Sequence, residues 1–301
     1  MTEKSTTSIP RPFARDLLAA RRARAECNGF RGKGDFMHRE VGEAIADRLS
    51  MVNRGYDRAL VIGAGAGAVN ETVRARASDV DIIDMSPERA VAAGARLVDQ
   101  LDVLDAPQGS FDLVVSVLEL HWSNDPVGEL IQMRRALRPD GLMLAALWGG
   151  RTLHELRTAL AEAEVVATGG ISPRIAPMAE IREMGGLLQR AGFAMPVADS
   201  ETTMVYYPDP VALMLDLRRM GETNIMTERR RNPMRRDMLA HAASVYQRAF
   251  SRADGRIRAT FETIFLSGWA PADGQPVPKQ PGSAGTRLAD ALSTEERKLP
   301  H

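Results

Sequence analysis

The sequence predicts an α/β fold in which helices cover both faces of a mostly parallel sheet. Short apolar runs alternate with helical stretches from residue 59 onward, and the runs are apolar at nearly every position. Such strands are buried on both faces, as in a parallel sheet. The first run leads directly into a glycine-rich stretch. The predicted core strands are "ALVIG" (59–63), "VDIID" (80–84), "FDLVVSV" (111–117) and "LMLAALW" (142–148).

The segment before the first strand is predicted to be helical. Apolar residues such as Val41, Ile45 and Leu49 recur at helical spacing, and "GFRGKGD" separates two helices. "DLLAARRARAE" fits an amphipathic helix better than an organelle presequence. No apolar run approaches the roughly 20 residues of a membrane span, and no apolar signal region is seen near the N-terminus. We therefore expect a cytoplasmic protein without a membrane span.

Helix signals follow each strand. Pro87 suits the first turn of a helix, and the helix in "DPVGELIQMRRAL" is expected to end at the turn "RPDG". Residues 151–192 are predicted to form two helices, followed by a strand or two up to residue 207. A helical stretch then precedes a last strand near 258–270. The predicted divisions are a helical cap (1–50), a core (51–207, with a helical insertion at 151–192), a helical lid (208–254), a last core strand (255–270) and a Pro/Gly/Ser-rich surface or poorly ordered tail (271–301).

Composition excludes several classes of function. Cys27 is the only cysteine, so neither an intrachain disulfide nor a cysteine-cluster metal site can form. The 39 basic and 39 acidic residues cancel, which argues against a general nucleic-acid-binding surface. The histidines are scattered without the spacing of a metal site, so no metal is expected.

The stretch "GAGAGA" after the first strand predicts a nucleotide-type cofactor loop. Glycines there let backbone N–H groups and a helix N-terminus approach a polar ligand. Two patterns fit: G-x-G-x-x-G/A for dinucleotides, and G-x-G-x-G for S-adenosyl-L-methionine. Asp84 ends the second strand 21 positions after Gly63, where its carboxylate can accept hydrogen bonds from ribose hydroxyls.

Motifs further along separate the two cofactors. "GSFDLVVSVLELHWSNDP", followed by a helix and "ALRPDGLMLAALW", resembles the middle of class I S-adenosylmethionine-dependent methyltransferases. The resemblance covers about residues 59–148. It implies a Rossmann-like methyltransferase fold with a mostly parallel seven-stranded sheet, N-terminal helices and a helical lid inserted before the last strand.

The same resemblance implies which residues bind the cofactor. Gly63, Ala64 and Gly65 would lie along its methionine portion, Asp84 would hold the ribose, and Met85 would contact the adenine. Val61 stands where the family usually has an acidic residue, so the pattern does not identify the partner of the cofactor's ammonium. The cofactor-binding candidates are Gly63, Ala64, Gly65, Gly67, Asp84, Met85, Asp102 (for the adenine amino group) and Ser116.

Residues near the transferable group are expected after the fourth strand and in the lid. His121 and Trp122 follow that strand at the carboxyl edge of the sheet, where open α/β sheets bind ligands, and are the candidate catalytic residues. Packing beneath the next helix is the alternative for both. The lid is rich in arginines that could close over a pocket and hold an acidic substrate. Arg218, Arg219 and Arg174 are the candidate substrate-binding residues.

A closer resemblance extends from about Phe13 to Leu292. "GGRTLHELRTALAEAE", "LMLDLRRMGETN" and "GWAPADGQPVPKQPGSAGTRLADAL" are similar to the methyltransferase-like assembly factors of respiratory complex I. The resemblance implies a protein partner, since the mitochondrial member of that branch hydroxylates an arginine of a complex I subunit near the quinone-binding region.

Two other functions stay open. Malonyl-carrier-protein O-methyltransferases of biotin synthesis share the core, an "HW"-like dipeptide and an arginine-bearing lid, which implies a carboxylate acceptor. The third hypothesis is an assembly chaperone that binds S-adenosylmethionine without catalysis. Val61 and the lack of an obvious base in the pocket keep that hypothesis open.

Overall fold

A single seven-stranded sheet organises the protein, in the order β3-β2-β1-β4-β5-β7-β6. The computed structural model describes residues 10–65, 67–99, 101–276, 283, 285–286 and 288–294. Strands β1 to β5 are parallel, whereas β7 is antiparallel to both β5 and β6. The strands are β1 (Tyr56–Ile62), β2 (Ala77–Asp84), β3 (Arg96–Leu97), β4 (Phe111–Val117), β5 (Leu137–Trp148), β6 (Ala194–Tyr207) and β7 (Ile257–Trp269).

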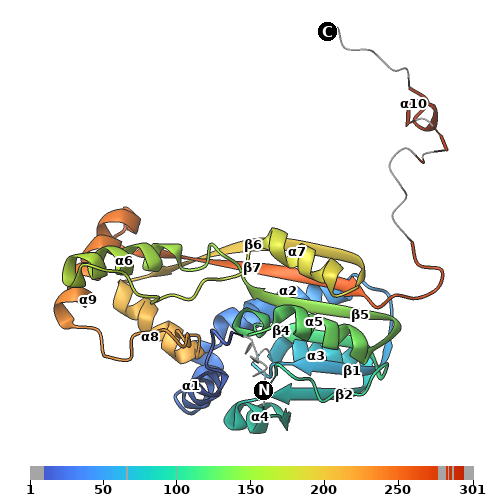
Figure 1. The fold of residues 1–301 in the computed structure, drawn as a ribbon, viewed down its shortest axis with the longest axis horizontal. Coiled ribbons are helices and arrows are strands. Elements are labelled where there is room, and N and C mark those ends of the chain that lie inside the picture. Colours follow the sequence, from blue (N-terminus) through green and yellow to red (C-terminus); the bar gives the residue numbers. More distant parts are fainter. Residues whose placement is uncertain are drawn as a thin grey trace, which may run out of the picture.

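Helices connect the strands and form the outer layers (Figure 1). The long strands β6 and β7 extend beyond the parallel part of the sheet, and α6, α8 and α9 gather around that extension. The helices are α1 (Arg15–Cys27), α2 (Phe36–Ser50), α3 (Gly67–Arg76), α4 (Pro87–Ala93), α5 (Pro126–Ala136), α6 (His154–Thr168), α7 (Ile181–Arg190), α8 (Pro210–Met220), α9 (Arg236–Phe250) and α10 (Leu288–Ala291). An irregular turn η1 (Phe30–Gly34), with non-helical backbone at Arg31 and Gly32, and a 3-10 turn η2 (Leu120–Trp122) complete the described elements.

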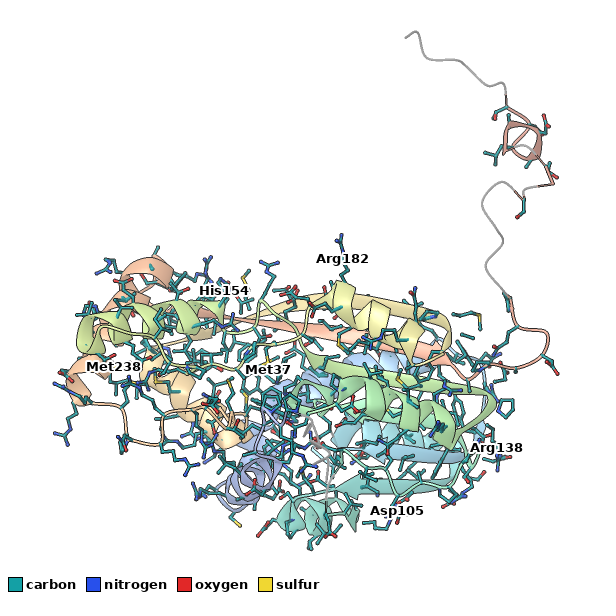
Figure 2. All side chains as sticks on the ribbon, viewed as in Figure 1. Met37, Asp105, Arg138, His154, Arg182 and Met238 are labelled. Carbon is teal, nitrogen blue, oxygen red and sulfur yellow. The ribbon has the colours of Figure 1, made fainter. Side chains whose placement is uncertain are left out.

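The core lies on both faces of the sheet because successive side chains of a strand point to opposite sides. Ala59 and Val61 of β1 belong to the cluster that α2 and α3 cover. Leu60 and Ile62 belong to the cluster beneath α5 and α7. Figure 2 shows the contrast between interior and surface: Met37 is fully buried, and Arg182 projects outward from α7. The prediction of strands buried on both faces is confirmed.

The predicted fold is confirmed, and the segment predicted as a strand or two is one strand over 194–207. Two details differ. Strand β3 was not predicted, because two residues are too few for a hydrophobic pattern. β5 begins at Leu137, and the predicted "RPDG" turn is an irregularity within it: pairing with β4 skips from Leu137 to Leu142, and Asp140 has a φ of +61°.

Helix α1 and the turn η1 dock on the lid helix α8, a point that sequence patterns leave open. Helix α1 contacts both α4 and α8, and the Ala14 N–H donates to the carbonyl of Ile225 at 2.9 Å. Gly34 of η1 lies against the backbone of Arg219, so close that a methyl group at Gly34 would lie 2.8 Å from the Arg219 oxygen. The N-terminal segment thus lies between the parallel sheet and the lid.

Of the predicted tail (271–301), the structure describes residues 271–276, 283, 285–286 and 288–294. For the other tail residues, the predicted surface or poorly ordered state lies outside the described part of the chain. Among the described residues, no helix has the length and apolar character that crossing a membrane requires.

Candidate functional site

The glycine loop follows β1 at the carboxyl edge of the sheet. Gly63 has a φ of +93°, a conformation that L side chains rarely adopt. The Ala64 N–H donates to Asp84 Oδ2 at 2.8 Å, and the Ser86 N–H donates to Asp84 Oδ1 at 2.7 Å. Because β1 and β2 are parallel neighbours, their ends meet here. The structure therefore brings together the glycine turn and the fully buried carboxylate that sequence analysis paired.

The second and third glycines have different surroundings. At Gly65, a methyl group would lie 3.0 Å from the ring of His38 and 3.1 Å from Nη1 of Arg89. At Gly67, the first residue of α3, a methyl group would meet no atom within 4 Å. A glycine at position 65 therefore lets the side chains of His38 and Arg89 approach the loop, whereas no neighbouring atom requires a glycine at position 67.

The remaining cofactor candidates lie at different depths around this edge. Met85 is buried beside the loop in the core cluster that includes Ile83. Ser116 of β4 pairs in register with Ile62, and its buried hydroxyl has no hydrogen-bond partner in the described structure. Asp102 instead contacts the N-terminal segment: its Oδ1 lies 3.3 Å from Nε of Arg15.

His121 and Trp122 meet a carboxylate from the lid. Both belong to η2 and are buried, and Trp122 is only 1% exposed. The Trp122 Nε1–H donates to Glu222 Oε2 at 2.7 Å, and His121 Nε2 lies 3.2 Å from the same oxygen. Glu222 follows Gly221, which ends α8 with a φ of +79°. This turn directs Glu222 from the lid toward the end of β4.

Arg22 of α1 completes a buried ionic network. It donates to Glu119 Oε1 at 2.5 Å, to Glu222 Oε1 at 3.3 Å and to the carbonyl of Leu118 at 3.0 Å. Burial alone would lower the pKa of Arg22, but the charges of Glu119 and Glu222 outweigh it and raise that pKa. Arg22 therefore stays charged and ties the N-terminal helix to β4 and the lid.

The pKa values of the two glutamates in the network, Glu222 and Glu119, are shifted in opposite directions. Burial would raise the pKa of Glu222, but the hydrogen bond with His121 and the charge of Arg22 hold it well below its usual range. At Glu119, burial dominates over the opposing charge of Arg22, and the pKa is raised. At neutral pH Glu222 is therefore charged, and the pKa of Glu119 lies above its usual range.

Burial also keeps two histidines neutral. It lowers the pKa of His38 to about 3, with the nearby charge of Arg89 acting in the same direction. Burial lowers the pKa of His121 too, against the hydrogen bond to Glu222. Arg89, buried near the charge of Arg22, has its pKa lowered to about 10. At neutral pH both rings are therefore uncharged, and Arg89 remains a cation.

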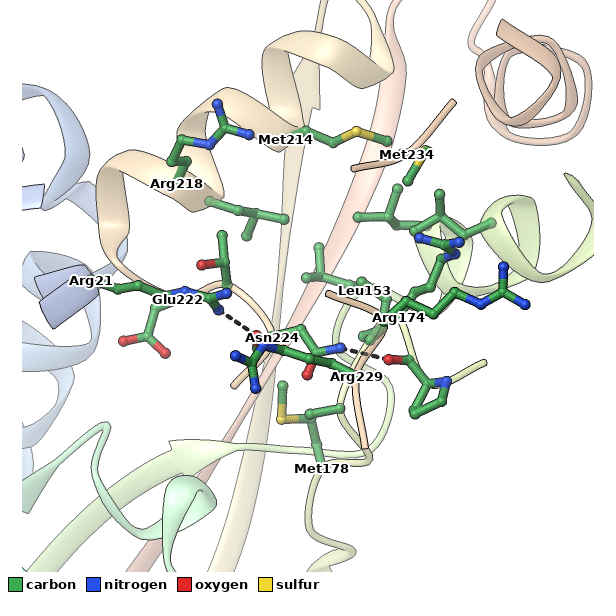
Figure 3. A pocket seen from close by; sticks show the side chains of 18 of the residues that line it. Arg21, Leu153, Arg174, Met178, Met214, Arg218, Glu222, Asn224, Arg229 and Met234 are labelled. Atoms are coloured by element: carbon green, nitrogen blue, oxygen red, sulfur yellow. Dashed lines mark hydrogen bonds between the residues drawn. The ribbon is translucent and has the colours of Figure 1, made fainter. Parts of the chain in front are cut away.

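A cavity of about 470 Å³ is lined by Trp122 and Glu222 together with residues of the lid. Figure 3 shows Glu222 and the labelled lid residues Met214 and Arg218 around it. Leu153, Met178 and Met214 supply part of its apolar lining. Its arginines come from α1, from α8, from the segment between α6 and α7, and from the segment between α8 and α9. They are Arg21, Arg174, Arg218, Arg229, Arg230 and Arg231.

The three predicted substrate-binding arginines are placed differently. Arg218 lines the cavity and has no ion pair within the described residues. Arg174 also lines it, but donates to Glu164 at 2.8 Å. Arg219 pairs with Asp216 at 3.6 Å and is not among the cavity-lining residues. Asn224 lies at the middle of the view in Figure 3, where its amide donates to the carbonyl of Pro173 at 2.6 Å.

Sequence reasoning missed five buried polar residues of this site: Arg22, His38, Arg89, Glu119 and Glu222. Charged residues usually face solvent, so sequence reasoning does not favour their burial. Three weak signals existed. Arg22 is at helical spacing from the apolar Leu18 and Ala25. Glu119 lies two residues before the His-Trp dipeptide, and Glu222 follows the glycine that ends α8.

The residues around the glycine loop fit a polar ligand that carries a positive and a negative charge. Several fully buried polar atoms have no hydrogen-bond partner within the described structure, which is costly unless a ligand satisfies them. They include both ring nitrogens of His38, Nε of Arg89, Oε2 of Glu119 and the hydroxyl of Ser116. In the described part of the chain, no group of three or more His, Cys, Asp or Glu side chains is arranged to hold a metal ion.

Comparison with known proteins assigns the fold and family. A methyltransferase domain model matches residues 60–145. The YcgJ protein of Bacillus subtilis is similar in structure, with a TM-score of 0.54 and 15% identity, covering 77% of this chain and 99% of that one. That likeness supports the fold alone.

Sequence relatives are much more similar over most of the chain. The mitochondrial arginine-hydroxylase NDUFAF5 of Danio rerio is 36% identical over 86% of this chain and 82% of its own length. The Homo sapiens protein of that name is 36% identical over 90% and 81%. The malonyl-[acyl-carrier protein] O-methyltransferase of Halorhodospira halophila is 31% identical over 77% and 81%.

These matches confirm the expected cofactor, S-adenosyl-L-methionine, and the expected relationship. The chain belongs to the class I S-adenosylmethionine-dependent methyltransferase superfamily, in the family that contains the arginine hydroxylase NDUFAF5.

Proposed function

We propose that this protein modifies an arginine side chain of a partner protein, a subunit of respiratory complex I, and thereby assists assembly of that complex. The observation that carries the proposal is the extent of similarity to NDUFAF5. Identity of 36–37% spans 86–90% of this chain, well beyond the core that many methyltransferases share. It therefore includes segments that contribute to the lid and the cavity.

The base of the cavity supports a cationic substrate group. Glu222 and Trp122 both line it, one with a carboxylate and the other with an aromatic ring. These are the two kinds of group that receive a guanidinium, by ion pairing and by cation–π contact. Glu222 already accepts hydrogen bonds from Arg22 and Trp122, so a substrate guanidinium would share this carboxylate with them.

Hydroxylation places requirements on reactants beyond the chain itself. A C–H bond of arginine becomes C–OH, with one oxygen atom from dioxygen. The second oxygen leaves as water, with two electrons and two protons from a reductant. The described residues serve to bind and orient the arginine. S-adenosyl-L-methionine, when bound, supplies a sulfonium-linked methyl group, which is the chemistry of methyl transfer.

Intact-peptide mass spectrometry tests the proposal. The quinone-site subunit of complex I would be purified from cells with and without this gene. We expect the deletion to remove the mass of one oxygen atom from a single arginine-containing peptide. A loss equal to one methylene group would make the protein an arginine methyltransferase, and an unchanged mass would refute modification of this subunit.

One observation favours a second candidate function. The arginines around the cavity attract an anionic group, as expected for O-methylation of a malonyl-carrier protein or a small carboxylic acid. A carboxylate is already an anion, so the chain needs only to position and desolvate it. Biotin auxotrophy after deletion would support this alternative, and growth without biotin would contradict it.

The partner also determines where the protein works. We infer that it acts in the bacterial cytoplasm and reaches the inner membrane only through the complex I subunit. Co-sedimentation of the protein with membranes should then require the presence of that subunit.

A further inference from the structure

One acidic and one basic side chain flank the glycine loop. A methyl group placed at Gly63 would lie 2.7 Å from Oε1 of Glu119, and one placed at Gly65 would lie 3.1 Å from Nη1 of Arg89. Glu119 follows the end of β4, whereas Arg89 belongs to α4. A carboxylate and a guanidinium thus approach neighbouring residues of one loop from two different elements.

Both side chains are deeply buried and incompletely paired. Glu119 is 2% exposed and Arg89 is 0% exposed. Oε1 of Glu119 accepts from Arg22, but its Oε2 has no hydrogen-bond partner in the described structure. Arg89 donates to the carbonyl of Met220 at 2.8 Å, while its Nε has no such partner there. Leaving buried charged atoms unsatisfied is costly, so a role in binding a ligand is favoured over packing alone.

The cofactor carries the complementary pair of charges. The methionine end of S-adenosyl-L-methionine is a zwitterion, with an ammonium and a carboxylate on one carbon atom. Strand β1 offers no side chain for the ammonium, because the position two residues before Gly63 is the buried, apolar Val61. Glu119 is the carboxylate that the structure brings to this loop in its place.

We propose that Glu119 and Arg89 form a zwitterion clamp, in which Glu119 binds the ammonium and Arg89 the carboxylate of the cofactor's amino-acid end. The clamp rests on the cofactor and not on the substrate of the proposed function. Charge-assisted hydrogen bonds in a buried site are about twice as strong as neutral ones, so each half contributes strongly to affinity. The clamp explains how a chain with Val61 on β1 retains the ammonium.

The Arg22 network positions one half of the clamp. Arg22 holds Oε1 of Glu119 and directs the other oxygen away from itself. Phe30 supports the other half, since the guanidinium carbon of Arg89 lies 4.2 Å from the centre of its ring. The N-terminal segment, to which Arg22 and Phe30 belong, therefore orders both charged groups around the loop.

Calorimetric binding of two related ligands tests the clamp. S-adenosylhomocysteine has the complete amino-acid end, and 5′-methylthioadenosine has the same adenosine and sulfur without it. We expect Glu119→Gln and Arg89→Gln each to weaken binding of S-adenosylhomocysteine by roughly 10- to 100-fold, from the loss of one charged hydrogen-bonded contact. The dissociation constant of methylthioadenosine for each variant should stay within about threefold of its value for the unmodified protein. This change is much smaller than the loss expected from one charged contact.

Asp84→Asn is the matched control. Asp84 also borders the loop, but its predicted partner is the ribose, which both ligands share. We expect this variant to weaken the binding of both ligands by the same factor. Retained methylthioadenosine binding by the Glu119 and Arg89 variants would also show that they are folded.

A further comparison uses the unmodified protein and so avoids any question of folding. Decarboxylated S-adenosylmethionine keeps the ammonium and lacks the carboxylate, so it should bind more weakly than the complete cofactor. The clamp is wrong if the unmodified protein binds S-adenosylhomocysteine no more tightly than methylthioadenosine. Equal losses for both ligands in the Glu119 and Arg89 variants would also refute it. Failure to find a modified arginine in the complex I subunit would refute the proposed function and leave the clamp intact.

Discussion

The indole N–H of Trp122 donates to Glu222 at 2.7 Å, and this contact joins the end of β4 to the end of α8. It links two segments 100 residues apart in the chain. The same carboxylate accepts a hydrogen bond from Arg22 of α1. The parallel sheet, the N-terminal helix and the lid thus meet at one buried carboxylate, between the glycine loop and the cavity.

The first prediction concerns Glu222. Glu222→Gln removes the charge that Arg22 and His121 contact while keeping the shape of the side chain. We expect a loss of about 1.5–3 kcal/mol in the free energy of unfolding, the range for a buried hydrogen bond to a charged group. Urea denaturation at pH 7 would measure it. Glu201→Gln is the control, because Glu201 pairs with Arg48 at the surface with 58% of its side chain exposed. Equal losses in the two variants would contradict a special role for Glu222.

The second prediction is loss of stability in mild acid. The pKa of His38 is about 3 in the folded protein and 6.5 in the unfolded chain. Between these values the unfolded chain binds the extra proton, so stability rises with pH and is complete above about 6.5. His38 alone should account for a loss of roughly 2 kcal/mol from pH 6.5 to pH 5, at 1.36 kcal/mol per pH unit.

Urea denaturation of the unmodified protein and His38→Gln, at pH 5 and pH 7.5, measures this contribution. We expect the variant to lose less stability than the unmodified protein on acidification. Some pH dependence will remain, because burial also lowers the pKa of His121. Identical pH dependence in both proteins would mean that His38 is not kept neutral by its surroundings.

The buried strands and the glycine loop could be predicted because they follow local sequence patterns. The strands around Val61, Ile83 and Val115 are apolar on both faces, so their burial could be predicted. The expected proximity of Asp84 to the glycine loop is observed, because parallel strands end at a common edge and the Ala64 N–H donates to Asp84. Local chemistry and tertiary position agree at these residues.

Buried charges could not be predicted in the same way. Arg22 lies at helical spacing from the buried Leu18 and Ala25, whereas Arg24 lies on the exposed face of α1. The pattern indicates which face is buried, but an arginine on that face is not expected to be fully buried without a charged partner. The burial of Arg22 depends on Glu119 and Glu222, which lie 97 and 200 residues away in the chain. A single sequence contains no periodicity that reports such a contact. The same reason explains why Asp102 contacts Arg15, which no local pattern predicts.

The third prediction separates two glycines of one motif. Gly63→Ala adds a methyl group at a φ of +93°, 2.7 Å from Glu119 and 3.0 Å from the carbonyl of Val117. We expect a loss of roughly 1–3 kcal/mol in the free energy of unfolding and weaker binding of S-adenosylhomocysteine. Gly67→Ala is the matched variant, because it begins α3 and would meet no atom within 4 Å.

We expect Gly67→Ala to be neutral or to raise stability by up to about 1 kcal/mol, through helix propensity and reduced freedom of the unfolded chain. Thermal unfolding and calorimetry of both variants provide the comparison. The assignment of strain to Gly63 would fail if the two substitutions had the same effect.

The last prediction uses two neighbouring arginines to determine the charge of the acceptor. Arg218 lines the cavity, whereas Arg219 pairs with Asp216 outside it. If the acceptor is a carboxylate, Arg218→Ala removes an attractive contact and should raise KM roughly 10-fold or more, as for loss of one charged hydrogen bond. If the acceptor is an arginine, the same change removes a like charge, so KM should stay level or fall. Arg219→Ala should leave KM unchanged in both cases. Steady-state kinetics with the unmodified arginine peptide of the subunit and with a malonyl-carrier protein would measure the two outcomes. A rise in KM for the arginine peptide would count against our proposed function.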